Sequence, residues 1–165
     1  MKQLNNPLTA EYQQLKTLVF SNSFPWFTDK SNCDEFYFYS HTFLERPEIR
    51  NYMMFPTVKS DYIGLFHEVM RQIFIHNQID VRCVYRMNAN AVEPNPNVSQ
   101  ITARHIDHTY PHNNMLIYLN DAGGATCTDD ARHDPNEDDI VVFSGYHWHE
   151  MPKSKRRVVL VATYI

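Results

Sequence analysis

The chain has 165 residues, a formal net charge of −4 at pH 7 and 43% hydrophobic residues. This length is typical of one domain, so we expect a single domain over residues 1–165 whose N-terminal third helps to cover the core. The acidic balance, with no long basic segment, argues against a nucleic-acid-binding protein, because such proteins contact many phosphates through Lys and Arg.

The cysteines and the N-terminus indicate a reduced, cytoplasmic protein. The three cysteines are Cys33, Cys83 and Cys127, which are odd in number and far apart in the sequence. Such spacing does not predict a disulfide framework. Residues 1–7 are polar and lack the apolar core of a signal peptide. No apolar run reaches the length of a membrane span, so we expect no membrane partner.

Two helices and one aromatic strand are predicted in residues 1–80, which we expect to support the rest of the fold. Residues 9–21 form the first helix, with Thr9 at its N-cap and an apolar stripe at helical spacing. Residues 35–44 are rich in aromatic side chains and suit a strand. Residues 60–77 form the second and more strongly amphipathic helix.

From residue 81 onward the pattern changes to short strands separated by turns. The predicted strands are 81–91, 100–107, 115–119, 125–128, 139–143, 146–151 and 158–164. Strands of this number and spacing indicate an antiparallel sandwich or barrel. We therefore expect a mainly β fold, with a jelly-roll core over residues 81–165 and the N-terminal helices packed on one outer face.

The tripeptide His105-Ile106-Asp107 is the first candidate for metal chemistry. On a strand, residues i and i+2 point to the same face, so His105 and Asp107 would share one space. With one more imidazole they would make the 2-His-1-carboxylate triad of non-haem Fe(II) sites. The tripeptide alone is weak evidence, because it also occurs by chance on half-exposed strands.

Downstream residues supply the missing imidazole and a cation. His147 and His149 lie on the predicted strand 146–151, and Arg156 and Arg157 come just before the last strand. Six of the nine histidines lie between residues 105 and 149, and this clustering favours a site over scattered surface histidines.

These elements, in this order, resemble the Fe(II)/2-oxoglutarate-dependent dioxygenases, and within them most closely the prolyl 4-hydroxylase-like branch. The resemblance covers residues 85–165 and rests on His-x-Asp, then Ile-Tyr-Leu-Asn, then the His-Glu-Met-Pro sequence, then Arg at the last strand. It implies a double-stranded β-helix, that is, a cupin-like jelly roll. It also implies Fe(II) and 2-oxoglutarate as cofactors, with ascorbate as a candidate accessory.

The resemblance also implies roles for individual residues. His105, Asp107 and His149 are the expected metal ligands, with His149 favoured over His147 because His-Glu followed by an apolar residue and a Pro-containing turn fits the family pattern. Because Asp107 is present, we expect hydroxylation, whereas the halogenases of this family carry a small residue there.

The distal carboxylate of 2-oxoglutarate needs a cation, and a bidentate Arg suits it best. Family members place that Arg eight or nine residues after the metal histidine, which favours Arg157 over Arg156. Tyr118 stands where prolyl-hydroxylase-like members direct a tyrosine hydroxyl at the same carboxylate; an ordinary core tyrosine is the alternative.

We therefore expect a dioxygenase that converts 2-oxoglutarate and O2 to succinate and CO2 while hydroxylating a peptidyl (prolyl-type) or small-molecule substrate. Two alternatives remain at this point: a non-catalytic jelly-roll binding protein, and a cupin-type metal enzyme independent of 2-oxoglutarate. In the cupin case three or four histidines would bind the metal, with His147 or His108 among them.

Overall fold

The computed structural model of the chain describes residues 1–30, 37–47, 55–95, 97 and 101–165. Its elements in chain order are β1 (Lys2–Leu4), α1 (Ala10–Val19), β2 (Phe27–Lys30), β3 (Tyr37–Glu45), β4 (Thr57–Val58), α2 (Ile63–His76), β5 (Val84–Val92), β6 (Asn113–Tyr118), β7 (Thr126–Thr128), β8 (Arg132–His133), β9 (Ile140–Phe143), β10 (His147–His149) and β11 (Arg157–Tyr164).

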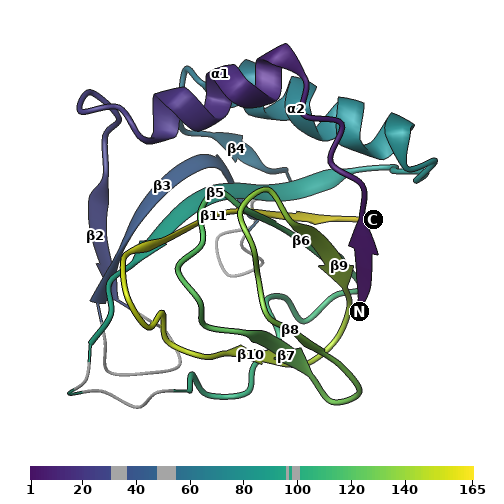
Figure 1. Cartoon of the computed structure of the whole chain (residues 1–165). Coiled ribbons are helices and arrows are strands. Elements are labelled where there is room, and N and C mark those ends of the chain that lie inside the picture. The colour runs from purple at the N-terminus through teal and green to yellow at the C-terminus, as the bar shows by residue number, and fades with distance from the viewer. Residues whose placement is uncertain (31–36, 48–54, 96, 98–100) are drawn as a thin grey trace.

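Two antiparallel sheets of unequal size face each other. The larger sheet has the strand order β1-β9-β6-β11-β5-β3-β2, with β4 paired to β3, and the smaller sheet has the order β10-β7-β8. In Figure 1 the small sheet lies below the large one, and the chain crosses repeatedly between them. This arrangement is the jelly-roll predicted from the strand spacing.

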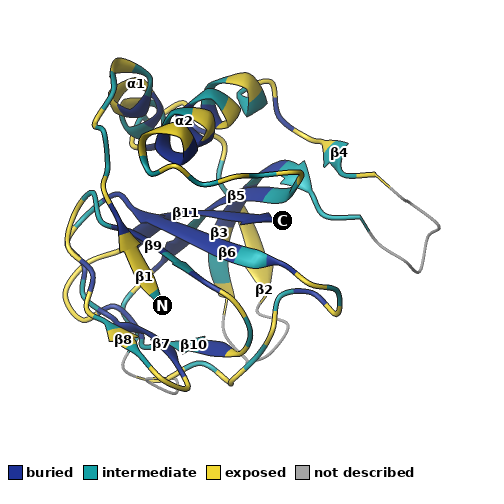
Figure 2. Ribbon diagram, turned by 90° about the vertical axis from the view of Figure 1, so that its right-hand side faces the viewer, coloured by how far each residue is buried: buried dark blue, intermediate teal, exposed yellow. Residues whose placement is uncertain are grey.

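Helices α1 and α2 cover the outer face of the large sheet (Figure 1). Their apolar stripes, and the side chains of the sheet that point outward, form the main core. On β11 these outward residues are Val158, Leu160, Ala162 and Tyr164, all of them buried. Figure 2 shows β5 and β11 buried beneath the two helices, whose exposed residues face solvent.

The other face of the large sheet turns toward the small sheet. Because side chains alternate along a strand, the residues between those of the core point to this inner face. They include Arg86, Asn88 and Asn90 on β5, Leu116 and Tyr118 on β6, and Arg157, Val159 and Val161 on β11, all of which line one cavity. Each of these strands therefore has one face that packs in the main core and one face that lines the cavity.

The predicted mainly β, jelly-roll fold with two helices on one face is confirmed, but one strand is not formed. Residues 101–107 make isolated bridges only, at Ile101 and His105, instead of the predicted strand 100–107. Residue 100, and residues 35 and 36 of the predicted aromatic strand, lie outside the described residues. The His-x-Asp tripeptide therefore sits on irregular chain held by only a few main-chain hydrogen bonds.

No helix in the described part of the chain is long and apolar enough to cross a membrane. Cys83 and Cys127 are free thiols, and Cys33 lies outside the described residues.

Candidate metal centre

A cavity of about 530 Å³ lies between the two sheets. Its lining includes the histidines His105, His147 and His149, together with Asp107 and Arg157. The volume falls within the range of about 300–1,000 Å³ that is usual for small-molecule sites. The residues predicted from the sequence as metal ligands and as the anion contact therefore line the same cavity.

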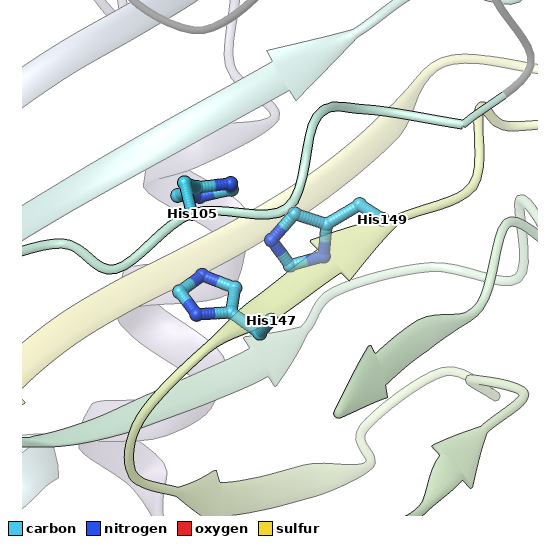
Figure 3. Close-up of side chains that lie close together, drawn as sticks. All are labelled: His105, His147 and His149. Carbon is cyan, nitrogen blue, oxygen red and sulfur yellow. The ribbon is translucent and has the colours of Figure 1, made fainter. Parts of the chain in front are cut away.

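Three imidazoles that line this cavity lie close together, as Figure 3 shows. Their ligand atoms all lie within 4.8 Å of one another. His147 and His149 project from β10, and His105 approaches from the irregular segment through a pair of main-chain hydrogen bonds with His147, each 2.9 Å long. Neighbouring ligand atoms at about 2.1 Å from one ion lie roughly 3 Å apart, so the three rings would have to move closer together by up to about 2 Å to hold an ion.

Each of the three rings has a partner at Nδ1. His105 Nδ1 lies 2.8 Å from the carbonyl oxygen of Ala103, and His149 Nδ1 lies 2.8 Å from Thr126 Oγ1. His147 Nδ1 lies 3.3 Å from the carbonyl oxygen of Gly145. Metal-binding histidines are commonly oriented in this way, by a hydrogen bond at the nitrogen that does not bind the metal. The Nε2 atoms are thus the ones left for an ion.

Asp107 lies beside this cluster, between two arginines. Its carboxylate Oδ1 is 3.6 Å from Arg86 Nη1, and its carbonyl oxygen accepts a 3.0 Å hydrogen bond from Arg46 Nη1. Burial would raise the pKa of the Asp107 carboxyl, but Arg86, His147 and His105 hold it below the usual value. The carboxylate is therefore ionised and ready to bind a cation at neutral pH.

Burial also keeps two of the imidazoles neutral. It lowers the pKa of His147 to about 4, with Asp107 acting in the opposite direction and His105 adding to the lowering. Burial, and then the nearby charge of Arg157, lowers the pKa of His149 well below its usual value. Neutral imidazole is the form that binds metal, and imidazole with carboxylate is a donor set that suits Fe(II). The three histidines could hold a metal ion, and the Asp107 carboxylate beside them is a further donor of a kind that suits iron.

The lowered pKa values predict how the stability of the metal-free protein depends on pH. Burial lowers the pKa of His108 to about 4 as well. A histidine with a pKa near 6.5 when unfolded and near 4 when folded takes up its proton in the unfolded state first, so the free energy of unfolding falls as pH drops from about 6.5 to 4. We expect a loss on the order of 3 kcal/mol for each of His108 and His147.

Urea unfolding with a chelator present, at pH 7 and at pH 4.5, measures this loss. The variant His147→Gln should show a smaller pH dependence than wild type. Stability that stays constant over this range would contradict the environment described for these two histidines.

Arg157 is a buried cation in the same cavity. It is 5% exposed, and its Nη1 donates hydrogen bonds of 2.9 Å to the carbonyl oxygens of Gly124 and Glu150. Its Nε is buried without a hydrogen-bond partner, and within the described ranges no carboxylate forms an ion pair with it. Burial lowers the pKa of the guanidinium, with Tyr118 opposing the change. A buried cation in this state favours an anionic ligand.

Gly124 makes room for Arg157. Its φ of +83° is one that other residues rarely adopt, and an added Cβ would lie 2.7 Å from the carbonyl oxygen of Glu150 and 2.9 Å from Arg157 Nη1. The sequence Asp121-Ala-Gly-Gly124 indicated only a turn, and nothing in it revealed this contact.

We expect Gly124→Ala to destabilise the protein by about 1–3 kcal/mol, because the backbone strain and the close contacts add up. Thermal unfolding measures the effect. Gly64→Ala is the matched control: Gly64 lies in α2 with nothing within 4 Å of an added Cβ, so alanine there should stabilise the helix by about 0.5–1 kcal/mol. Equal effects of the two changes would contradict this account of Gly124.

Tyr118 is fully buried and close to Arg157. Burial raises the pKa of its phenol to about 12, although the charge of Arg157 and the hydrogen bond between Tyr118 and Thr126 act against this. The Tyr118 hydroxyl lies 2.6 Å from Thr126 Oγ1. The side chain therefore keeps its proton at neutral pH and can serve as a hydrogen-bond donor.

Other residues considered from the sequence lie elsewhere. Arg156 is exposed, forms an ion pair with Glu93 and stacks over the ring of Tyr39. His108 is buried, with its Nε2 2.8 Å from Thr163 Oγ1, and does not belong to the three-histidine cluster. The roles of Arg86, Thr126 and Gly124 could not be predicted from the sequence, because they depend on contacts between segments that are distant in the chain.

Solved structures with this fold were found, although no protein-family model matches the chain and no curated protein matches its sequence. An oxidoreductase of the 2OG-Fe(II) oxygenase family from Burkholderia pseudomallei is 13% identical, with a TM-score of 0.66 over 93% of this chain and 77% of the other. A Pseudomonas putida prolyl-4-hydroxylase is 14% identical, with a TM-score of 0.54 over 99% of this chain and 91% of the other. A predicted oxalate decarboxylase from Thermotoga maritima is 9% identical, with a TM-score of 0.51 over 85% of this chain and 91% of the other. The chain thus shares the fold of 2-oxoglutarate oxygenases, including prolyl hydroxylases, and of cupins.

Proposed function

We propose that the protein is an Fe(II)/2-oxoglutarate-dependent dioxygenase that hydroxylates a peptidyl or small-molecule substrate. Its ligands are His105, Asp107 and His149, as the sequence resemblance implies. The fold of the oxygenases and the presence of these three side chains in one cavity support the proposal. Proteins with several different activities share this fold, so the assignment of function rests on the residues of the site.

The buried guanidinium of Arg157 is the observation that carries it. A site that binds only a metal has no use for a buried, unpaired cation in the same cavity. A dicarboxylate cosubstrate explains it, because one carboxylate and the keto oxygen can bind the metal while the other carboxylate pairs with Arg157. Arg157 also lies near the proposed metal ligand His149, because it donates a hydrogen bond to the carbonyl oxygen of Glu150, the next residue.

The proposal assigns a role to several residues of the cavity. His105, His149 and Asp107 would hold the ion. Arg86 maintains the charge and orientation of Asp107. Arg157, with Tyr118, fixes the cosubstrate by its distal end, so that its keto acid end points toward the histidines. The apolar side chains of Leu116 and Val161 line the cavity between these groups and limit water.

When bound, the iron would couple the oxidative decarboxylation of 2-oxoglutarate, which yields succinate and CO2, to hydroxylation of an unactivated C–H bond. The cavity of about 530 Å³ is large enough for a cosubstrate and part of a second molecule. A prolyl residue or a small molecule fits this description, and the prolyl-hydroxylase fold of the neighbours agrees with the former.

Release of succinate from 2-oxoglutarate tests the class without knowledge of the substrate. The protein is incubated with Fe(II), ascorbate, O2 and 2-oxoglutarate, with and without candidate substrates, and succinate is quantified. Uncoupled turnover above the level of Asp107→Ala supports the proposal. No succinate from an iron-loaded protein under any condition counts against it.

One observation favours a second candidate, a cupin-type metal enzyme that does not use 2-oxoglutarate. Three histidines approach one point, whereas the dioxygenase triad uses two. Cupin-type sites bring three or four histidines, and a predicted oxalate decarboxylase shares the jelly-roll fold. In this case His147 would be a ligand as essential as His105 and His149, and Arg157 would have no effect on metal-dependent activity.

A further inference from the structure

A chain of hydrogen-bonded side chains runs from the histidine cluster toward the buried arginine. His149 Nδ1 lies 2.8 Å from Thr126 Oγ1, and the same oxygen lies 2.6 Å from the Tyr118 hydroxyl. Thr126 is 0% exposed and Tyr118 is 1% exposed. The register of the small sheet holds the first contact in place, because Thr126 on β7 pairs directly with His149 on β10.

The protons in this chain can be followed from the metal end. If His149 binds an ion through Nε2, its proton must be on Nδ1, and Nδ1 then donates to Thr126 Oγ1. The hydroxyl hydrogen of Thr126 can no longer point at His149. The oxygen of Tyr118 is its acceptor at hydrogen-bond distance, because leaving a buried hydroxyl without an acceptor is costly.

The consequence appears at Tyr118. Once its oxygen accepts from Thr126, its own hydrogen is free to point into the cavity. Tyr118 and Arg157 line the same cavity, so an anion held there by Arg157 lies in the region that the Tyr118 hydroxyl faces. Tyr118 then donates its hydrogen bond to that anion.

We propose that Thr126 is a positioning residue that couples the metal ligand His149 to the site for the distal carboxylate of 2-oxoglutarate. It sets the His149 ring with Nε2 toward the ion, and it turns the Tyr118 hydroxyl toward the carboxylate beside Arg157. This inference rests on the proposed dioxygenase function and adds that metal and cosubstrate bind cooperatively through these hydroxyl groups as well as through direct chelation.

Thr126 is suited to the task. A threonine hydroxyl offers one donor and two acceptor lone pairs, which the chain requires at its middle position. Its branched Cβ restricts rotation of the side chain, so the hydroxyl stays between its two partners. Valine has nearly the same shape but neither donates nor accepts, and serine keeps the hydroxyl. These two replacements separate hydrogen bonding from packing.

The test compares Thr126→Val and Thr126→Ser with wild type under anaerobic conditions. We measure affinity for Mn(II) by competition with a chelator, and affinity for 2-oxoglutarate in the Mn(II)-saturated protein by calorimetry. Thr126→Val should lower Mn(II) affinity about 10- to 100-fold, the usual effect of removing the partner of a metal-binding histidine. It should also lower 2-oxoglutarate affinity about tenfold, since one hydrogen bond to a charged group is lost. Thr126→Ser should restore both to within about threefold.

Thr128→Val is the matched control. Thr128 lies on the same strand, and its hydroxyl donates to Asp130 at 2.8 Å and not to a histidine. Its replacement should leave both affinities unchanged. If Thr126→Val binds Mn(II) as wild type does, the coupling is refuted while the dioxygenase proposal stands. If wild type binds Mn(II) but no 2-oxoglutarate, the proposed function itself fails, and the inference fails with it.

Tyr118→Phe completes a double-mutant cycle. The coupling predicts that this change lowers 2-oxoglutarate affinity about as much as Thr126→Val does, leaves Mn(II) affinity within about threefold, and adds little when the two are combined. Additive losses would show that Thr126 and Tyr118 contact the cosubstrate independently, which overturns the coupling. If Thr126→Val does not fold, Tyr118→Phe alone decides: unchanged 2-oxoglutarate affinity refutes the inference.

Discussion

Replacing His105 or Asp107 by alanine is expected to abolish Fe(II) binding while the protein remains folded. Each change removes one of the three proposed protein ligands. The two ligands that remain cannot hold the ion firmly. We expect the affinity to fall at least 100-fold, beyond the loss caused by changing a residue that only orients a ligand. Anaerobic titration with Fe(II) measures the affinity of each variant for the ion. Thermal unfolding shows whether the variant is still folded.

His149→Ala should have the same effect as these changes, whereas His147→Ala should retain the metal. Retention of Fe(II) by His105→Ala would contradict the site itself. Loss of the metal from His147→Ala would show that the three-histidine cluster is the ligand set, as in the cupin-type alternative. His67→Ala, on the exposed side of α2, serves as the control for a histidine outside the cavity.

Arg157→Ala should weaken 2-oxoglutarate binding roughly thirty- to a thousandfold and leave Fe(II) binding intact. The change removes a charge-assisted pair in a partly dry cavity, which costs on the order of 2–4 kcal/mol. Arg157→Lys should fall between alanine and wild type, because lysine keeps the charge but loses the two-pronged geometry. Calorimetric titration of 2-oxoglutarate into the Mn(II) protein under anaerobic conditions gives the affinities.

Arg156→Ala is the matched control for this prediction. Arg156 is the preceding residue, but its side chain lies on the outer surface in an ion pair with Glu93. It should leave 2-oxoglutarate affinity unchanged. A loss with Arg156→Ala and none with Arg157→Ala would mean that the cosubstrate binds outside the cavity described here.

Much of the fold follows from local patterns in the sequence. The alternation along β11 separates Val158, Leu160 and Ala162, which face the helices, from Arg157 and Val159, which face the cavity. Alternation with a period of two residues can be recognised from the strand sequence alone, and it places Arg156 and Arg157 on opposite faces. The choice of Arg157 came from the spacing that the family resemblance implies. The amphipathic helices are also predictable from local sequence, because their apolar residues repeat with the helical period of about 3.6 residues.

The short strands β1, β2, β4 and β8 were not predicted. They have two to four residues, lie at edges, and carry mostly exposed side chains. Such strands have no apolar alternation and exist because their main-chain groups pair with a neighbouring strand. That pairing depends on the tertiary fold, so these strands cannot be predicted from the local sequence pattern.

The predicted ligands His105, Asp107 and His149 line one cavity, but their surroundings were not predicted. The side chains of His105 and Asp107 do share a cavity, although not through strand alternation, because residues 101–107 form only isolated bridges. Asp107 is held instead by Arg46 and Arg86, which lie 61 and 21 residues earlier in the sequence. The place of Thr126 depends likewise on the pairing of β7 with β10. Contacts of this kind cannot be read from spacing.

We propose that iron and 2-oxoglutarate bind together in the cavity that contains Arg157. A titration of 2-oxoglutarate into the anaerobic Fe(II) protein, followed by visible absorption, tests this binding most directly. Chelation of the iron by the keto acid should produce a metal-to-ligand charge-transfer band that saturates at one cosubstrate per chain. The band should require far more 2-oxoglutarate in Arg157→Ala. An iron-loaded wild-type protein that gives no such band at any concentration of 2-oxoglutarate would contradict the account.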